Sequence, residues 1–355
     1  MSCFSLFKKS KERSEESSLG EDSQKCWRDY VTAGRAFFFG VCVCVACIIA
    51  GYAHYTDPGP LSEERMVVIP QGGMHKVAQT LQEQHLLSPG WSSLVFFRTA
   101  ALVTSRHGGL HAAEFDFPAR VSISHILDIL RHGRPVTHSV TIPEGITALR
   151  IYDILQKAAA LQGELPEITE GSVYPQTFFY RWGTERRSLL AKMQELMHRY
   201  EIQVWEHRDR DALQGVVETP EQLLVLASLV ERETALPAER PQVARVFLNR
   251  LKKNMRLQTD PTVIYAVSEG KGSLGRPLSH ADLEYNSPYN TYENTGLPPG
   301  PICSPSHQSM EAVAHPASGD ALYFMATGRG GHSFSQTLAE HTQHVRDYRK
   351  QRRKP

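Results

Sequence analysis

The first feature of the hydrophobic pattern is an uncharged apolar run over residues 36–53. As a helix, a run of this length is just long enough to cross the hydrocarbon core of a bilayer. Lys and Arg are frequent before the run and absent after it until Arg65, so the positive-inside rule places the N-terminus in the cytoplasm. The alternative is a cleaved signal peptide, but the leader is long and a small-x-small cleavage site is missing. We therefore predict a single uncleaved transmembrane helix over 36–53.

The segments on either side of this run are polar. Residues 1–35 are rich in serine and mixed in charge, which predicts a disordered cytoplasmic tail. "TDPGP", residues 56–60, is typical of a linker, so we expect residues 54–65 to lead from the membrane to the first folded region.

Three similar stretches follow, each with a short strand pattern and then a helical apolar period. "VVIPQGGMHKVAQTL" and "VTIPEGITALRIYDIL" share an Ile-Pro-x-Gly turn, and "EFDFPARVSISHILDIL" resembles them more loosely. In the last stretch Ser122 is a candidate N-cap and Gly133 lies just past the helix end. Residues 66–160 are therefore predicted to be α+β. Two interpretations stay open, ordinary α+β packing and a glycan-binding module of the LysM kind.

The rest of the chain, residues 161–350, is predicted to be a mainly helical and loop-rich domain. A charged helical stretch covers 185–213, a strongly apolar helix runs from Pro220 to Glu233, and another helix covers 242–252. The final third is dense in Asn, Thr, Tyr, Pro, Gly and His, a composition typical of ordered irregular loops. Aromatic rings and polar side chains together suit a sugar polymer.

Charge and cysteine content exclude several other classes of protein. The 39 Lys and Arg residues balance 38 Asp and Glu residues, so nucleic acid is disfavoured as a partner. Five of the six cysteines lie at or before residue 47, which leaves Cys303 alone in the remainder. This distribution argues against a zinc ribbon and against a disulfide framework.

The stretch "LASLVERETA", residues 226–235, places two glutamates at the end of the apolar helix. Glu231 and Glu233 both border its apolar face, where an ionised carboxylate is costly to bury. The simplest interpretation is a surface or interface carboxylate paired with a nearby arginine. Helical periodicity alone cannot choose between the two glutamates.

A set of separated motifs gives this helix a context. "LASLVERETALPAERPQVARVFLNRLKKNMRLQTDPTVIYAV", "YNTYENTGLPPGPICSP", "AVAHP", "LYFMATGRGGHSF" and "TLAEHTQHV" occur in this order. With the N-terminal anchor, they resemble the YceG-like family of endolytic murein transglycosylases (MltG). The resemblance runs from about Val67 to Tyr348 and is densest from Leu223 onward.

The resemblance implies an inner-membrane enzyme whose LysM-like region and catalytic domain lie outside the cytoplasm. Such an enzyme cuts nascent peptidoglycan glycan strands between N-acetylmuramic acid and N-acetylglucosamine. It needs no cofactor, leaves a 1,6-anhydro end and thereby ends strand elongation. Peptidoglycan synthases are expected as partners at the level of the family. The glutamate that the resemblance marks as catalytic is Glu231, and Glu233 is the second glutamate of the same motif.

This reaction needs one acid. The sugar's own 6-hydroxyl is the nucleophile, whereas most glycosidases need two carboxylates. Glu231 would protonate the departing oxygen and then accept the proton of the 6-hydroxyl. The apolar surroundings of a helix end are expected to keep the proton on this acid by desolvation.

Further candidate residues lie in the loops. Gln258 and Asp260 of "QTDP" are equally suited to substrate contact and to scaffold, and Asp260 can cap the following helix. Tyr289, Asn290 and Tyr292 of "YNTY" are expected to line the groove. The last candidate, His332 of "GGHSF", is expected to bind sugar or to hydrogen-bond near the acid, and the glycines before it suggest a tight turn.

Metal binding is disfavoured, because His315 and His332 have no partners at ligand spacing. The sequence departs from the family at "EGSVYPQT", where Ser172 and Gln176 replace the commoner aromatic and acidic residues, which puts a catalytic role for that segment in doubt. Pro301 and Cys303 also differ, which we interpret as local packing.

Two rival functions remain open at this point. One is a muramidase that hydrolyses the strand with Asp260 as second carboxylate, and the other is a wall-binding scaffold without activity. The intact Glu231 argues against the scaffold.

Overall fold

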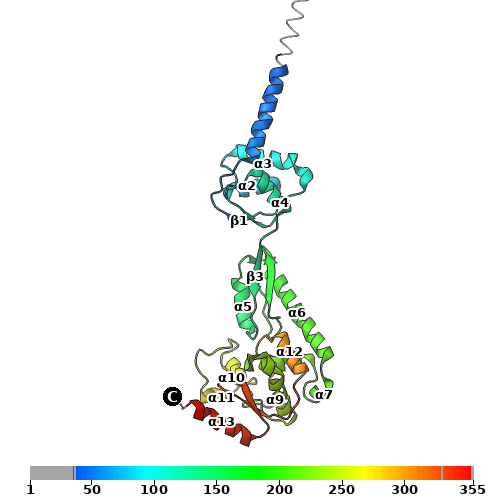
Figure 1. Ribbon diagram of the computed structural model, residues 1–355, viewed down its shortest axis with the longest axis vertical. Coiled ribbons are helices and arrows are strands. Elements are labelled where there is room, and N and C mark those ends of the chain that lie inside the picture. Colours follow the sequence, from blue (N-terminus) through cyan, green and yellow to red (C-terminus); the bar gives the residue numbers. More distant parts are fainter. Residues whose placement is uncertain (1–34, 36, 329–330, 353–355) are drawn as a thin grey trace, which may run out of the picture. The chain divides into compact units, whose positions relative to one another are not determined.

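The computed structural model describes residues 35, 37–328 and 331–352, and it divides into two compact units, Met1–Val136 and Thr137–Pro355 (Figure 1). The division falls inside the region 66–160 that the sequence pattern suggested as one module. Helices and short strands are mixed in both units, which confirms the predicted combination of helix and sheet. Each unit has its own apolar core and is described by itself.

Among the described residues, one helix is long and apolar enough to span a membrane. It covers Phe37–Thr56, which is 20 residues, so it begins one residue later and ends three later than the predicted 36–53. Thr56 Oγ1 donates to the Tyr52 carbonyl at 3.0 Å in the last turn. The predicted cytoplasmic tail lies outside the described residues, apart from residue 35.

The segment after this helix, expected to be a linker, is packed into unit 1. Leu61 is buried in its core. The Gly59 N–H donates to the Arg120 carbonyl at 3.2 Å, and the Arg120 N–H donates to the Leu61 carbonyl at 2.7 Å. A side chain at Gly59 would collide with the Val121 carbonyl oxygen, 2.2 Å from the position of its Cβ. This segment therefore has little freedom relative to unit 1.

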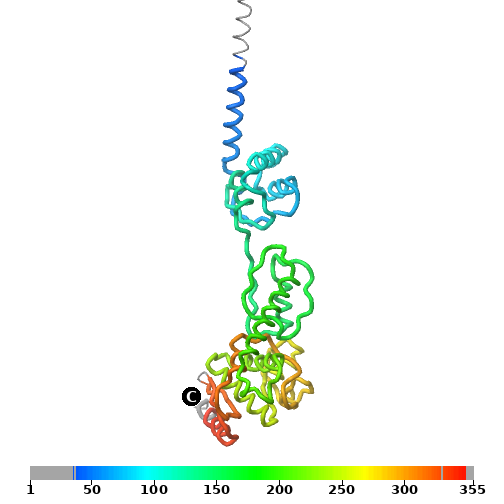
Figure 2. The backbone as a smooth tube through the Cα atoms, turned by 90° about the vertical axis from the view of Figure 1, so that its right-hand side faces the viewer, coloured from blue at the N-terminus to red at the C-terminus, as the bar shows by residue number. Residues whose placement is uncertain are grey.

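Unit 1 has two strands separated in sequence by two helices. The order is β1 (Arg65–Val68), α2 (Met74–Glu83), α3 (Trp91–Val103), a short 3-10 turn η1 (Ser105–His107), β2 (Glu114–Phe117) and α4 (Ile123–His132). β1 pairs antiparallel with β2, so that Val67 lies opposite Phe115. Helices α2 and α3 lie side by side (Figures 1 and 2). The predicted cap of α4 is confirmed, because the Ser122 side chain accepts a hydrogen bond from His125 N.

Unit 2 begins with the stretch that contains "VTIPEGITALRIYDIL". β3 (Thr137–Thr141) precedes α5 (Ala148–Lys157) and pairs antiparallel with the aromatic strand β5 (Thr177–Arg181). β4 (Leu161–Gln162) pairs in parallel with β6 (Thr184–Glu185). The long helix α6 (Arg186–His207) follows. Side chains from α5, β3 and α6 form one core in which Ile151, Val140 and Met193 are buried.

The remainder of unit 2 is built around α8 (Pro220–Glu233). Its eight residues from Leu223 to Val230 are all buried, because α6, α9, α10 and α12 pack around it. A helix that is buried on all sides is apolar all round, as the sequence pattern here requires. Thr219 caps its N-terminus by accepting a hydrogen bond from Gln222 N.

The elements around α8 are short and joined by long loops. They are α7 (Arg210–Leu213), η2 (Pro237–Glu239), α9 (Arg240–Lys252), α10 (Asp260–Val267), α11 (His280–Leu283) and α12 (His307–Ala314), then the hairpin β7 (Tyr323–Ala326) and β8 (His332–Ser335), and α13 (Leu338–Arg352). α12 lies against α8 and α9 although it is far from them in sequence (Figure 1). This arrangement brings loops from distant parts of the chain to the C-terminal end of α8.

Candidate active site

The Glu231 carboxylate lies in a closed set of contacts at the end of α8. Its Oε1 accepts a hydrogen bond from Arg240 Nη2 at 3.2 Å, and its Oε2 accepts from Ser306 N at 2.9 Å and from Ser306 Oγ at 2.5 Å. The side chains of Glu231 and Arg240 are each only 6% exposed. Arg240 Nη1 also donates to Ser306 Oγ at 2.8 Å and to Gln308 Oε1 at 3.3 Å. Glu231 thus connects α8 to the first residues of α9 and α12.

Glu233, two residues later, has different surroundings. Its Oε2 accepts a hydrogen bond from Thr259 Oγ1 at 2.6 Å. Burial raises the pKa of Glu233 above its usual range, and the nearby Asp260 adds to the increase. The Thr259 hydroxyl and the positive charges of His332 and Arg250 oppose the increase without cancelling it. A raised pKa keeps a larger fraction of this acid protonated near neutral pH.

The "QTDP" loop holds the hydroxyl group that contacts Glu233. Thr259 N donates to Thr291 Oγ1 at 3.1 Å, and the Thr262 and Thr291 hydroxyls are 2.9 Å apart. Asp260 is the first residue of α10 and does not cap it; its Oδ1 accepts a hydrogen bond from Tyr292 OH at 2.6 Å. Gln258 is exposed and has a positive φ of 47°. The loop that contacts Glu233 therefore also carries Gln258 and Asp260, and Asp260 holds Tyr292 beside it.

His332 is paired with a residue that the sequence did not single out, Glu239. Its Nδ1 lies 2.7 Å from Glu239 Oε2, and its N–H donates to Glu239 Oε1 at 2.8 Å. Burial acts to raise the pKa of Glu239, but the hydrogen bonds from His332 outweigh it and lower that pKa. Gly331, the glycine next to His332, has φ 92°, and a Cβ there would lie 2.5 Å from Glu239 Oε1.

Asn290 does not face an open groove in this structure. It is fully buried, and its Nδ2 donates to the carbonyls of Leu283 at 2.9 Å and Tyr285 at 2.8 Å. Its Oδ1 accepts from Tyr292 N at 2.9 Å. The amide thus stabilises the loop that carries Tyr289 and Tyr292, and a direct sugar contact would require this network to open.

Tyr289 lines a cavity of about 910 Å³, and none of the other predicted site residues does. The other main contributors are Tyr152, Glu170, Tyr265 and the turn 299–301. Burial raises the pKa of Glu170 to about 7, although the Ala148 N–H donates to its Oε1 at 2.9 Å and works against the increase. Glu170 belongs to the "EGSVYPQT" segment, whose role the sequence had put in doubt.

The packing role expected for the two unusual residues agrees with their positions. Cys303 is fully buried, and its Sγ donates to the Ser228 carbonyl at 3.4 Å. Pro301 lies against Gly171, where a Cβ would be 2.7 Å from Pro301 Cγ.

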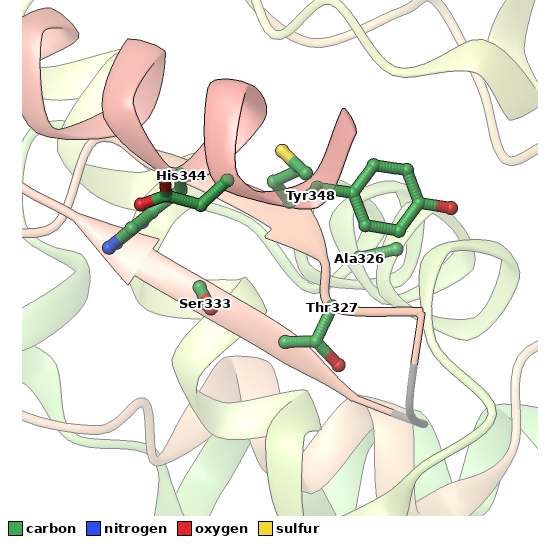
Figure 3. Close-up of a pocket in the computed structure, with 7 residues that line it drawn as sticks. Ala326, Thr327, Ser333, His344 and Tyr348 are labelled. Atoms are coloured by element: carbon green, nitrogen blue, oxygen red, sulfur yellow. The ribbon is translucent and has the colours of Figure 1, made fainter. Parts of the chain in front are cut away.

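A second cavity, of about 370 Å³, lies between the β7–β8 hairpin and α13 (Figure 3). Ser333, Thr327 and Tyr348 are among the residues that line it. None of the predicted site residues lines this cavity. His332, the neighbour of Ser333, points to the opposite face of the hairpin because side chains alternate along a strand.

Several residues of the site were missed from the sequence. Ser306 carried a usable signal, since Ser-His-Gln-Ser before an apolar helical period is typical of an N-cap. No local sequence signal marks Arg240, Glu239 or Thr259, because contacts between distant segments bring them to α8. Their roles appear only when the loops are folded.

Fold and site together define an α+β protein with two carboxylates at the end of a buried central helix, preceded by an apolar N-terminal helix. The chain belongs to the YceG-like family, which matches residues 67–347.

The chain is also similar to individual proteins. The endolytic murein transglycosylase of Bacillus subtilis (strain 168) is 49% identical over 126 residues, which is 36% of this chain and 34% of that protein. The endolytic murein transglycosylase of Streptococcus pneumoniae serotype 2 is 27% identical over 88% of this chain. The match spans 65% of the length of the Streptococcus protein. A crystal structure of a YceG-like protein from Listeria monocytogenes is 28% identical, with a TM-score of 0.49, over 79% of this chain and 98% of that one.

Proposed function

We propose that this chain is a lytic transglycosylase that cuts peptidoglycan glycan strands internally and leaves 1,6-anhydro-N-acetylmuramic acid ends. Membership of the YceG-like family and the names of the Bacillus and Streptococcus relatives support the reaction class. The observation that carries the proposal is Glu233, a half-buried acid with a raised pKa at the end of a rigid helix.

Glu233, rather than Glu231, is the acid in this proposal. The contacts of Glu231 with a guanidinium, a hydroxyl and an amide N–H occupy both of its oxygens. Among the described residues, by contrast, Glu233 Oε1 has no hydrogen-bond partner, while Thr259 holds Oε2 in place. We therefore assign to Glu233, in this proposal, the role that the sequence resemblance gives to Glu231.

The reaction proceeds as one exchange of protons without water. Glu233 donates its proton to the glycosidic oxygen while the bond from the anomeric carbon to that oxygen breaks. The 6-hydroxyl of the same N-acetylmuramic acid forms a new bond to the anomeric carbon and gives its proton to the Glu233 carboxylate. The acid is thereby restored, and the two products together have the composition of the substrate.

The surrounding groups assist in defined ways. Arg250 and His332 act electrostatically on Glu233 and stabilise its carboxylate after the first proton transfer. Asp260 and Tyr292, hydrogen-bonded to each other at the edge of the site, are placed to bind sugar hydroxyls. Glu231 and Arg240 keep α8, α9 and α12 in register, and this positions Glu233.

Unit 1 serves glycan binding and membrane attachment in this proposal. Its order of strand, two helices and strand, with the strands paired antiparallel, supports the LysM-like interpretation. The helix Phe37–Thr56 anchors the chain in the inner membrane as a single span with a cytoplasmic N-terminus. Both units then act on strands outside the cytoplasm as synthases release them, so that cleavage ends strand elongation.

Mass spectrometry of digested sacculi tests the reaction class. The full chain in detergent should release fragments whose ends weigh one water less than reducing ends. Reducing ends would instead favour the hydrolase, for which the proximity of Asp260 to Glu233 provides a second carboxylate. An absence of soluble fragments, with binding retained, would favour a scaffold.

A further inference from the structure

Helix α3 of unit 1 exposes apolar side chains along one side. Trp91 is 78% exposed, Leu102 68% and Val103 76%. Val95 is also exposed, whereas Phe97 on the other side of the helix is fully buried. Large apolar side chains grouped on one face of a folded protein mark a surface that contacts something else.

Three of the exposed apolar residues share one side of the helix. Trp91, Val95 and Leu102 are spaced by four and seven residues, which places them on one side of an α-helix. The buried residues Phe97 and Ala101 lie on the opposite side, against the core of unit 1. Ser92, Arg98 and Thr99 are exposed beside these apolar residues. In the part of the chain that the structure describes, nothing covers the outer side of α3.

The position of α3 indicates what covers it. The ring of His54, in the last turns of the helix Phe37–Thr56, lies 4.7 Å from the ring of Phe96 in α3. Tyr55 packs against the same core as Phe96. At about 1.5 Å per residue, a 20-residue helix is about 30 Å long, the thickness of the hydrocarbon core. His54 and Phe96 therefore lie at the depth where a membrane-spanning helix leaves the hydrocarbon. Figure 1 shows α3 next to this end of the helix.

The charge of this region suits an anionic membrane surface. Residues 84–113 contain no Asp or Glu. They contain Arg98 and Arg106, both exposed, and three histidines. Basic residues close to a membrane are attracted to anionic headgroups by about 1 kcal/mol each. Tryptophan, here Trp91, is the side chain most typical of the interface between lipid and water.

We propose that α3 lies in the headgroup layer of the membrane as a second attachment of unit 1, with Trp91, Val95 and Leu102 toward the acyl chains. The occupant of this exposed side is the lipid bilayer itself. This inference rests on the membrane anchor of the proposed function. It gives unit 1 a fixed orientation on the membrane, which a single spanning helix cannot provide because it can rotate about its axis.

Fluorescence quenching in vesicles tests the inference. The full chain is reconstituted into vesicles of phosphatidylethanolamine and phosphatidylglycerol, with and without bromine on the acyl chains. Wild type is compared with Trp91→Phe, which is expected to fold because position 91 is exposed. The emission lost in this variant belongs to Trp91. We expect brominated lipid to quench it at least about twofold and dissolved acrylamide to quench it little. The matched control is Trp182→Phe, an exposed tryptophan of unit 2, whose contribution should respond to acrylamide and not to bromine.

Flotation of the same vesicles separates the two ways of failing. If the chain floats with the vesicles in high salt but the Trp91 emission is quenched by acrylamide and not by bromine, the anchor stands and the α3 inference is overturned. A protein partner would then be the better occupant of this side of α3. If the chain does not float, the anchor fails and the α3 inference fails with it. Both the anchor and the α3 inference are supported if the chain floats and bromine quenches the emission of Trp91 but not that of Trp182.

Discussion

Glu231 and Glu233 are two positions apart, and the fold gives them opposite surroundings. Guanidinium and hydroxyl groups surround the first, whereas burial and a neighbouring carboxylate raise the pKa of the second. The sequence predicts a catalytic acid at the end of the apolar helix. It cannot choose between the two glutamates, because both border the same apolar face. The partners that distinguish them, Arg240, Ser306 and Thr259, come from other parts of the chain, so no local pattern could make the choice.

Replacing the proposed acid should abolish catalysis and leave the fold intact. Glu233→Gln keeps the size of the side chain and an acceptor for the Thr259 hydroxyl but cannot transfer a proton. We expect the rate of release of anhydro ends from sacculi to fall by at least about a hundredfold, the usual scale for a general acid–base. The melting temperature should be unchanged or slightly higher, since a neutral amide is cheaper to bury than a carboxylate.

The corresponding change at Glu231 should lower the free energy of unfolding. Glu231→Gln leaves the Arg240 guanidinium buried without a counter-charge, which costs about 3 kcal/mol in comparable buried pairs. Denaturant unfolding should show this loss, and activity per folded molecule should remain well above that of Glu233→Gln. A Glu231→Gln protein of normal stability that forms no product would return the catalytic role to Glu231.

The Glu170 carboxyl should make stability depend on pH. Its pKa is about 7 in the fold against 4.5 in the unfolded chain, so the folded state binds the proton more tightly. Its contribution is complete below pH 4.5 and is lost as pH rises through 7. Glu170→Gln should match wild type at pH 5 and exceed its free energy of unfolding at pH 8 by about 1–2 kcal/mol, a value reduced for partial exposure. Thermal unfolding at both pH values checks this. Glu269→Gln, in the same cavity but exposed, is the matched substitution with which this result is compared.

At the scale of elements, hydrophobic periodicity predicted the helices that have one buried face and one face exposed to solvent. α4 and α5 show this pattern and were predicted with their strands. α3 was missed, because "WSSLVFFRTAALV" is apolar on both sides and gives no clear period. The pairing of β3 with β5 was also missed, since a strand does not encode which distant strand it will contact. Loop contacts such as Glu239 with His332 escaped prediction for the same reason.

The β7–β8 hairpin should depend on the glycine before His332. Gly331→Ala places a methyl group 2.5 Å from Glu239 Oε1 and strains a residue with φ 92°. We expect a loss of stability of about 2 kcal/mol and faster amide hydrogen exchange in the hairpin. The matched control is Gly215→Ala, where φ is 73° but no atom lies within 4 Å of the new Cβ. If the two variants lose the same stability, the contact with Glu239 has no energetic role.

At the scale of the whole molecule, the chain divides at Val136 into two compact units, to which the proposed function assigns glycan binding and chemistry. Deleting residues 65–134 while keeping the anchor should weaken pull-down on insoluble peptidoglycan by about tenfold or more and change turnover on short glycan fragments little. Binding far from the scissile bond need not affect the chemical step. Unit 2 should remain folded because its cores are its own. Unchanged pull-down by a folded deletion variant would contradict glycan binding by unit 1.

The packed segment between the helix Phe37–Thr56 and β1 has a consequence for the proposed function. Eight residues separate Thr56 from Arg65, and the contacts of Gly59 and Leu61 remove most of their slack. An anchored chain of this design cannot drift outward into the older layers of the wall. In the proposed function such a chain would need no chemical mark to tell new polymer from old, because the tether would keep it beside the membrane where strands are released. The short segment between the helix and β1 would thus select glycan strands by their age.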